Sequence, residues 1–220
     1  MRATPVGGRV ATPAAPLRCA VLISGGGSGM KALVASQQKH NPAHTTSVVI
    51  SNRPEAGGIE LAEALGINVE IVPVPTEVGA SQRTMHEDAV MAVLEQHNIE
   101  LVVLSGYMRL LSPHILSAWG GRIVNIHPSY LPHFPGAHAH RDVLAASSPL
   151  TGCTVHMVDE GMDTGAIIAQ STVPVLRGDD EHSLSERVKV EEHRLYPQVL
   201  NWIAQGYVTI EDGTAHLDVP

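Results

Sequence analysis

Short β-branched segments alternate with helical segments along the first 127 residues, and this alternation restricts the possible folds more than any other feature of the sequence. Apolar runs typical of strands occur at 19–24, 46–51, 68–72, 101–105 and 123–127. The segments between them are typical of helices, and the clearest helix, 81–97, has an apolar stripe made of Met85, Ala89, Val93 and Leu94. Strands that alternate with helices pair in parallel. The sequence therefore predicts an α/β, Rossmann-like three-layer fold around a mostly parallel sheet.

The pattern changes after residue 127. The runs 152–158 and 166–173 are separated by only about seven residues, whereas a parallel crossover needs a dozen or more, so antiparallel strands are expected in the C-terminal half. Ser183 and Glu186 have the spacing of a capping box and predict a long helix that ends near Gly206. A terminal hairpin is expected around residues 212–213.

Composition indicates one globular domain over residues 18–220, because 44% of the 220 residues are hydrophobic and the mean hydropathy is close to zero. Residues 1–17 are rich in Ala, Pro, Thr and Gly and predict a disordered N-terminal extension. No apolar run reaches the roughly 18 residues that a membrane span requires. Cys19 and Cys153 lie in apolar runs and suit the buried thiols of a reduced, cytoplasmic protein.

The charge distribution limits the classes of partner. A net charge of -8 argues against a nucleic-acid partner. The first acidic residue is Glu55, however, and all six charged residues before it are basic. This local excess of positive charge is compatible with binding of a small anion in the N-terminal part of the chain.

Asn125 and His127 end the last of the five apolar runs and are the first candidates for catalysis. Residues i and i+2 of a strand point to the same face, so both side chains are expected to project together from the sheet edge. An amide can donate a hydrogen bond to a developing oxyanion, and a histidine can move a proton at neutral pH. The pair suits acyl transfer, although the same residues also occur where they only cap the loop after a strand.

A glycine-rich loop, residues 24–29, follows the first predicted strand and precedes a helix expected to start near Met30. Backbone N–H groups and a helix dipole that converge in this way form a phosphate site. The loop lacks the last glycine of the dinucleotide fingerprint, and no Gly-Lys-Ser/Thr sequence of a P-loop follows it. We therefore expect this loop to bind a phosphate group, in a site that is neither a dinucleotide site nor a P-loop.

Five ordered blocks resemble the phosphoribosylglycinamide formyltransferase family over about residues 18–205: VLISGGGSG (21–29), SGYMRLLSP (105–113), NIHPSYLPHFPGAHAHR (125–141), TVHMVDEGMDTGAIIAQ (154–170) and EEHRLYP (191–197). The resemblance implies transfer of a formyl group from 10-formyltetrahydrofolate, as co-substrate, to the amine of phosphoribosylglycinamide in purine synthesis. It implies small-molecule partners only, without a metal, a nucleic acid or a membrane. A monomer and a homodimer are both open.

The resemblance also implies the roles of individual residues. It assigns oxyanion stabilisation and proton donation to Asn125 and His127, and a supporting carboxylate to Asp163, which would otherwise be interpreted as a turn residue. A nearby carboxylate is expected to raise the pKa of His127 and to favour the imidazolium form. The positions matched to phosphate and ribose binding are Gly27, Ser28, Gly29, Lys189 and Glu192. Those matched to folate binding are Arg83, Met108, Arg109, Leu110, Leu111, Asn125, Asp159 and Asp163.

The chain departs from the family pattern at three positions. Gly29 stands where Asn is usual, Tyr130 where Leu is common, and Lys189 where a neutral polar residue is frequent. Lys189 can equally be an exposed helix residue, and the same holds for Arg83. His138 and His140 lack a third metal ligand at a recognisable spacing, so they are expected to line the phosphate side or to shape the loop.

Two alternative functions stay open. A formyltetrahydrofolate hydrolase would pass the formyl group to water, but such enzymes typically have a second histidine at the position of Pro128. A non-catalytic nucleotide-binding regulator would not need Asn125.

Overall fold

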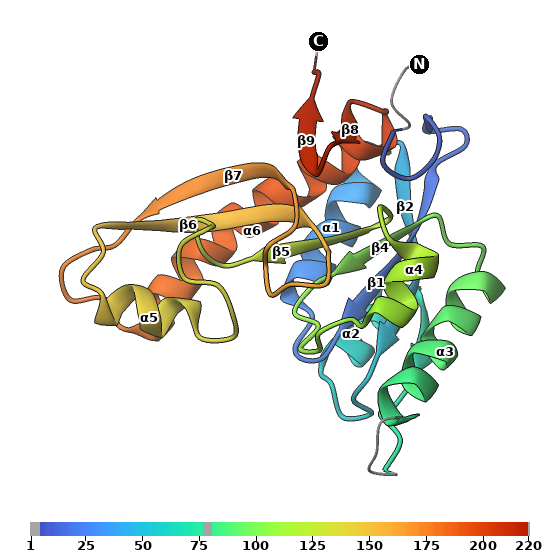
Figure 1. The fold of residues 1–220 in the computed structure, drawn as a ribbon, viewed down its shortest axis with the longest axis horizontal. Helices are drawn as coiled ribbons and strands as arrows, with labels where there is room; N and C mark the ends of the chain where they lie inside the picture. Colours follow the sequence, from blue (N-terminus) through green and yellow to red (C-terminus); the bar gives the residue numbers. More distant parts are fainter. Residues whose placement is uncertain (1–4, 77–80, 220) are drawn as a thin grey trace.

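A seven-stranded sheet in the order β3-β2-β1-β4-β5-β6-β7 forms the centre of the structure, a computed structural model that describes residues 5–76 and 81–219 (Figure 1). The first five strands pair in parallel, and the last two are antiparallel to their neighbours. Both predictions for the sheet are thus confirmed. The strands are β1 (Leu17–Ile23), β2 (His44–Ser51), β3 (Asn68–Ile71), β4 (Leu101–Leu104), β5 (Ile123–His127), β6 (Leu150–Met157) and β7 (Ile167–Pro174).

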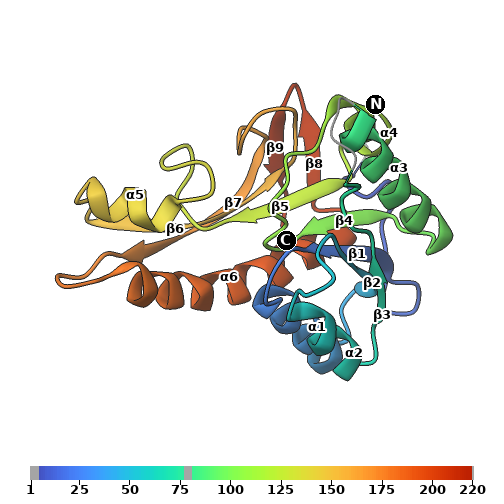
Figure 2. The same ribbon diagram turned by 90° about the horizontal axis from the view of Figure 1, so that it is seen from below.

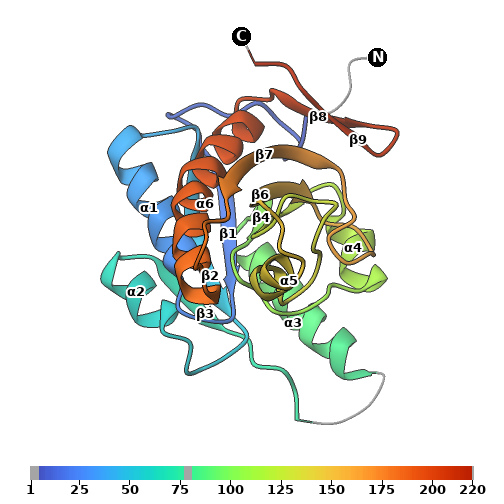
Figure 3. The ribbon, with the colours of Figure 1, turned by 90° about the vertical axis from the view of Figure 1, so that its left-hand side faces the viewer.

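Helices cover both faces of the sheet and complete three layers (Figure 3). Alternate residues of β1 point to opposite faces, so Cys19 and Val21 pack in one apolar cluster while Ala20 and Leu22 pack in another. The first cluster includes side chains of α1, α2 and α6, and the second includes those of α3 and α4. The helices are α1 (Ser28–His40), α2 (Gly58–Ala64), α3 (Ser81–Gln96), α4 (Pro113–Trp119), α5 (Ala139–Ala145) and α6 (Glu181–Ala204).

The strand order reverses beside β1, which pairs with β2 on one side and with β4 on the other. In such sheets the connections leave in opposite directions at this point and open a crevice at the carboxyl ends of the strands. Seen from below, helix α1, which follows β1, and helix α4, which follows β4, lie on opposite sides of the sheet (Figure 2). The fold therefore places the glycine-rich loop and the end of β5 around one crevice.

The N-terminal extension is not disordered in the part that the structure describes. Residues 5–16, here called the N-terminal clasp, pack against α6 and the terminal hairpin of β8 (Val208–Glu211) and β9 (Thr214–Leu217). The Val6 N–H donates to the Val208 carbonyl at 3.0 Å, and the Val6 side chain is buried. The prediction of disorder was wrong for these residues because a proline-rich segment without periodicity can still pack in an extended form.

Two helix details also differ from expectation. Helix α6 begins at Glu181, because Asp180 is the residue that caps it: its side chain accepts from the Ser183 N–H at 2.8 Å. In α3 the buried face contains His86, Glu87, Val90 and Leu94, whereas Met85 is 46% exposed. The predicted stripe was therefore rotated relative to the face that packs.

Both cysteines are buried and free. Within residues 5–76 and 81–219, no helix is long and apolar enough to cross a membrane.

Candidate active site

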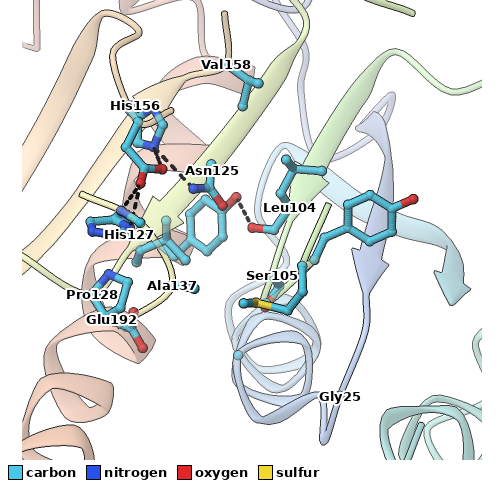
Figure 4. Close-up of a pocket in the computed structure, with 18 of the residues that line it drawn as sticks. Gly25, Leu104, Ser105, Asn125, His127, Pro128, Ala137, His156, Val158 and Glu192 are labelled. Carbon is cyan, nitrogen blue, oxygen red and sulfur yellow. Dashed lines mark hydrogen bonds and ion pairs between the residues drawn. The ribbon is translucent and has the colours of Figure 1, made fainter. Parts of the chain in front are cut away.

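A cavity of about 770 Å³ lies at the carboxyl ends of the parallel strands. Its wall combines the glycine-rich loop, the segment after β4, the end of β5, the 159–163 turn and one face of α6. Thirteen of the predicted site residues line it: Gly27, Ser28, Gly29, Met108, Arg109, Leu110, Leu111, Asn125, His127, Asp159, Asp163, Lys189 and Glu192. Figure 4 shows part of this wall.

His127 ends β5 and is almost fully buried. Its Nε2 lies 2.9 Å from the carbonyl oxygen of Phe134, and its Nδ1 lies 3.3 Å from Oδ2 of Asp163. An oxygen atom thus faces each ring nitrogen, an arrangement in which both nitrogens can donate when the ring is protonated. The ring can therefore hold one proton permanently and exchange a second.

The charge state of His127 differs from the expectation based on the sequence. Burial lowers the pKa of His127, and this effect outweighs the Phe134 carbonyl and the Asp163 carboxylate, which both raise the pKa. The net direction is thus opposite to the expected increase. The prediction considered the carboxylate but not the desolvation of a histidine at a strand end inside the cavity.

Asp163 lies in the turn after β6 with a φ angle of 57°, a left-handed conformation that Asp and Asn tolerate better than most residues. Its Oδ2 accepts a hydrogen bond of 2.8 Å from the Gly136 N–H, which ties the loop after β5 to this turn. Burial opposes ionisation of this carboxyl group, but His156, the Gly136 N–H and His127 together lower its pKa. Asp163 is therefore an anion at neutral pH.

His156 is a site residue that the sequence interpretation missed. It stands opposite Asn125 in the antiparallel pairing of β5 with β6. Its Nδ1 donates to the Met157 carbonyl at 2.8 Å, which leaves Nε2 to accept from Nδ2 of Asn125 at 3.2 Å. The same Nε2 lies 3.6 Å from Oδ1 of Asp163. Figure 4 shows Asn125, His127 and His156 turned toward one another.

In the sequence, only the position of His156 within the block 154–170 pointed to a role for this residue. That block does not indicate which residue lies opposite His156. The pairing matters because it fixes the orientation of the Asn125 amide. One amide hydrogen is held by His156, and the other is available to a ligand in the cavity.

The start of α1 forms the opposite wall of the cavity. Gly27 has a φ angle of 70° and precedes the helix without a side-chain cap, so the first N–H groups of α1 have no capping oxygen from it. A Cβ atom at Gly27 would lie 2.8 Å from the Gly58 Cα, so the loop requires glycine at this position. This uncapped helix start has the geometry of an anion site.

Gly29, one of the departures from the family pattern, packs closely against Ser105. A Cβ atom at Gly29 would lie 2.6 Å from Oγ of Ser105. A side chain at position 29 therefore requires the Ser105 hydroxyl to move.

Two residues of α6 project into the same cavity. Burial raises the pKa of Glu192 to about 7. Lys189 also lines the cavity, and its Nζ lies 2.6 Å from Oε1 of Glu186. His140 also lines the cavity, whereas His138 lies outside this lining. In the described part of the chain, no group of three or more His, Cys, Asp or Glu side chains could hold a metal ion.

The wall on the other side of the cavity is mostly apolar. Met108 and Leu110 are 59% and 52% exposed, and Arg109, Leu111 and Asp159 line the same region. Arg83 is exposed on α3 and is not part of the lining. The structure therefore does not bring Arg83 to the cavity with the other residues matched to folate binding.

Known proteins are similar to this chain in both sequence and fold. Residues 17–200 match the formyl transferase family model. The chain is 36% identical to the phosphoribosylglycinamide formyltransferase of Escherichia coli and 40% identical to that of Mycobacterium tuberculosis; the alignments cover 90% and 92% of this chain and 92% of each relative. It is 42% identical to the human trifunctional purine biosynthetic protein adenosine-3 over 88% of this chain, but this alignment covers only 19% of that protein.

The solved structures of related proteins agree with the sequence comparison. A glycinamide ribonucleotide transformylase of Symbiobacterium toebii superposes with a TM-score of 0.87 at 37% identity, covering 92% of this chain and 94% of the other. The extent of the family match, the two relatives of similar length and the shared fold lead to one conclusion: the chain belongs to the formyl transferase family.

Proposed function

We propose that the chain transfers the formyl group of 10-formyltetrahydrofolate to the amine of phosphoribosylglycinamide, as the names of its relatives of similar length indicate. The observation that carries the proposal is the meeting of Asn125, His127 and Asp163 in one cavity that also contains an uncapped helix start. An acyl transfer between two amines needs an oxyanion donor and a proton carrier, and a phosphorylated substrate needs an anion site.

Each substrate has a matching wall. The phosphate group of phosphoribosylglycinamide binds at Gly27, Ser28 and Gly29, where backbone N–H groups and the dipole of α1 favour an anion. Lys189 and Glu192 face the rest of this substrate from α6. The flat pteridine of the folate lies along the apolar wall that contains Met108, Arg109, Leu110 and Leu111, and near Asp159.

The reaction proceeds by direct attack of the substrate amine on the formyl carbon. The carbonyl oxygen becomes negatively charged in the tetrahedral intermediate, and the amide hydrogen of Asn125 that His156 does not hold stabilises this charge. No covalent enzyme intermediate is needed, and neither Cys19 nor Cys153 lines the cavity.

His127 carries the proton. Its lowered pKa leaves the ring neutral at pH 7, so it can take a proton from the amine as the C–N bond forms. The Phe134 carbonyl and the Asp163 carboxylate stabilise the resulting imidazolium. The ring then returns the proton to the folate nitrogen as that nitrogen leaves.

The two alternatives predict different products. Purified protein is incubated with synthetic phosphoribosylglycinamide and 10-formyltetrahydrofolate, and formylated ribotide and free formate are measured separately. Formylated ribotide in amounts equal to the tetrahydrofolate produced is expected. Formate without formylated ribotide would indicate a hydrolase, and no conversion of folate would indicate a binding protein. The buried free cysteines suit the cytoplasm as the location of this reaction.

A further inference from the structure

The hydroxyl group of Tyr196 lies where β4 and β5 separate. The parallel pairing of these strands ends at Leu104 and Asn125. The Tyr196 hydroxyl donates to the Leu104 carbonyl at 2.9 Å and lies 3.1 Å from the Val124 carbonyl oxygen. One proton is thus shared between two strand ends, one of which carries the Asn125 side chain into the cavity (Figure 4).

The two strands separate because they have different partners beyond this point. After Leu104 the chain turns toward β1, where the Ser105 N–H donates to the Leu22 carbonyl at 3.0 Å. Strand β5 instead continues to His127 along β6. Tyr196, which is only 3% exposed, adds a hydrogen-bond donor from outside the sheet at this separation. Burial raises the pKa of Tyr196 well above its ordinary value, so the hydroxyl stays protonated.

Tyr196 also connects these strand ends to α6. It follows Glu192 by four residues and therefore lies on the same face of the helix, and both side chains line the cavity. Asn125 is thus held by His156 through its amide and by Tyr196 through the neighbouring backbone. Two independent contacts fix its position.

We propose that Tyr196 is a positioning residue that fixes the end of β5, so that the Asn125 amide faces the reacting carbonyl group. This inference rests on the role of Asn125 proposed above. Loss of the hydroxyl removes the hydrogen bonds that tie α6 to these two carbonyl groups, so the strands can shift where they separate. A displacement of about 1 Å at a catalytic group lowers rates by up to about 100-fold.

Tyr196→Phe, which keeps the ring, tests the proposal. We expect kcat to fall about tenfold, within the range that misplacement of a catalytic group produces, while both KM values stay within about twofold of the wild type. In an Asn125→Ala background, Tyr196→Phe should lower kcat by less than about twofold, because the group that it positions is already absent.

Val199→Ala is the control for stability. Val199 lies on α6, is fully buried and does not line the cavity. This variant should lose stability without loss of kcat, which separates a weaker α6 from a misplaced Asn125.

Three results would overturn the positioning role. The first is a wild-type kcat in Tyr196→Phe, and the second is a failure of this variant to fold. The third is a double variant in which Tyr196→Phe lowers kcat by the same factor as it does in the wild-type background. Wild-type turnover in Asn125→Ala alone would overturn the proposed role of Asn125, and the inference about Tyr196 with it. An impaired Asn125→Ala with an unaffected Tyr196→Phe would overturn only the inference.

Discussion

At the scale of single residues, Asn125 and His127 differ in what holds them. Asn125 is oriented by the ring of His156, whereas His127 lies between a backbone carbonyl and the carboxylate of Asp163. The first arrangement fixes a donor, and the second allows a proton to be gained and lost. Replacement of either side chain should therefore affect turnover more than substrate binding.

Asn125→Ala and His127→Ala are each expected to lower kcat at least about 100-fold, the loss typical of removing an oxyanion donor. Equilibrium binding of phosphoribosylglycinamide should stay close to that of the wild type. Steady-state kinetics and calorimetry measure the two quantities. Turnover at the wild-type rate in either variant would contradict the assignment.

Asp163→Asn should move the acid limb of the profile of kcat/KM against pH to lower pH. The carboxylate raises the pKa of His127, so its removal lowers that pKa further, and the neutral ring persists to lower pH. Asn suits the positive φ angle of residue 163 and can still accept from the Gly136 N–H, so the turn should be preserved. A limb that stays at the same pH would show that Asp163 does not act on His127.

At the scale of elements, the N-terminal clasp is held by an ion pair. Both terminal nitrogens and Nε of Arg9 are used: the guanidinium bonds Glu100 with two nitrogens and the carbonyl groups of Ala15 and Pro16. Although partial burial of Glu100 opposes ionisation, Arg9 and the Arg18 N–H together lower the pKa of the carboxyl group. The ionised pair thus links the clasp to the start of β4.

Arg9→Ala should lower the free energy of unfolding by about 1 kcal/mol at pH 7, because the pair is partly exposed. The pKa of Glu100 is lower in the folded state, so this stabilisation is present above the ordinary pKa of 4.5 and is lost as the pH falls through the lower value. Urea titrations at several pH values should show the difference from the wild type shrinking below pH 4.5. A difference independent of pH would indicate that only packing is lost.

Asp180→Ala should also destabilise the protein and lower its melting temperature, because it removes the cap of α6. Glu186→Ala, which changes an exposed residue of the same helix, is the control. Thermal unfolding compares the two variants. Equal melting temperatures would contradict the assignment of the cap.

Elements were predictable where a local pattern decides them, as in the alternation of parallel strands with helices and in the antiparallel pair β6 and β7. The register of β5 against β6 depends on contacts between segments that are distant in the sequence. The sequence alone therefore did not predict that His156 lies opposite Asn125. The buried face of α3 was misjudged because Glu87 is buried by hydrogen bonds to Ser112 rather than by apolar packing. The direction of the His127 pKa likewise depends on burial, which only the assembled cavity defines.

At the scale of the whole molecule, one cavity presents an uncapped helix start and an apolar wall on either side of Asn125 and His127. Such a cavity can hold both substrates at the same time. In addition, burial raises the pKa of the Cys19 and Cys153 thiols to about 12, so neither thiol is a reactive nucleophile.

Initial rates measured against both substrates should therefore give intersecting lines in double-reciprocal plots, as for a ternary complex. Parallel lines would indicate a covalent formyl-enzyme intermediate and would contradict direct transfer.

The N-terminal clasp and the cavity lie at opposite edges of the sheet. The contacts of the clasp with Glu100, which precedes β4, and with β8 place it at the edge of the sheet where the parallel strands begin, whereas the cavity lies at the edge where they end. Pro5 forms a bridge with Thr209 of β8, so the first residues that the structure describes lie against the terminal hairpin (Figure 1). Changes in the clasp or in the terminal hairpin should therefore leave the mouth of the cavity unobstructed, because both lie at the opposite edge of the sheet.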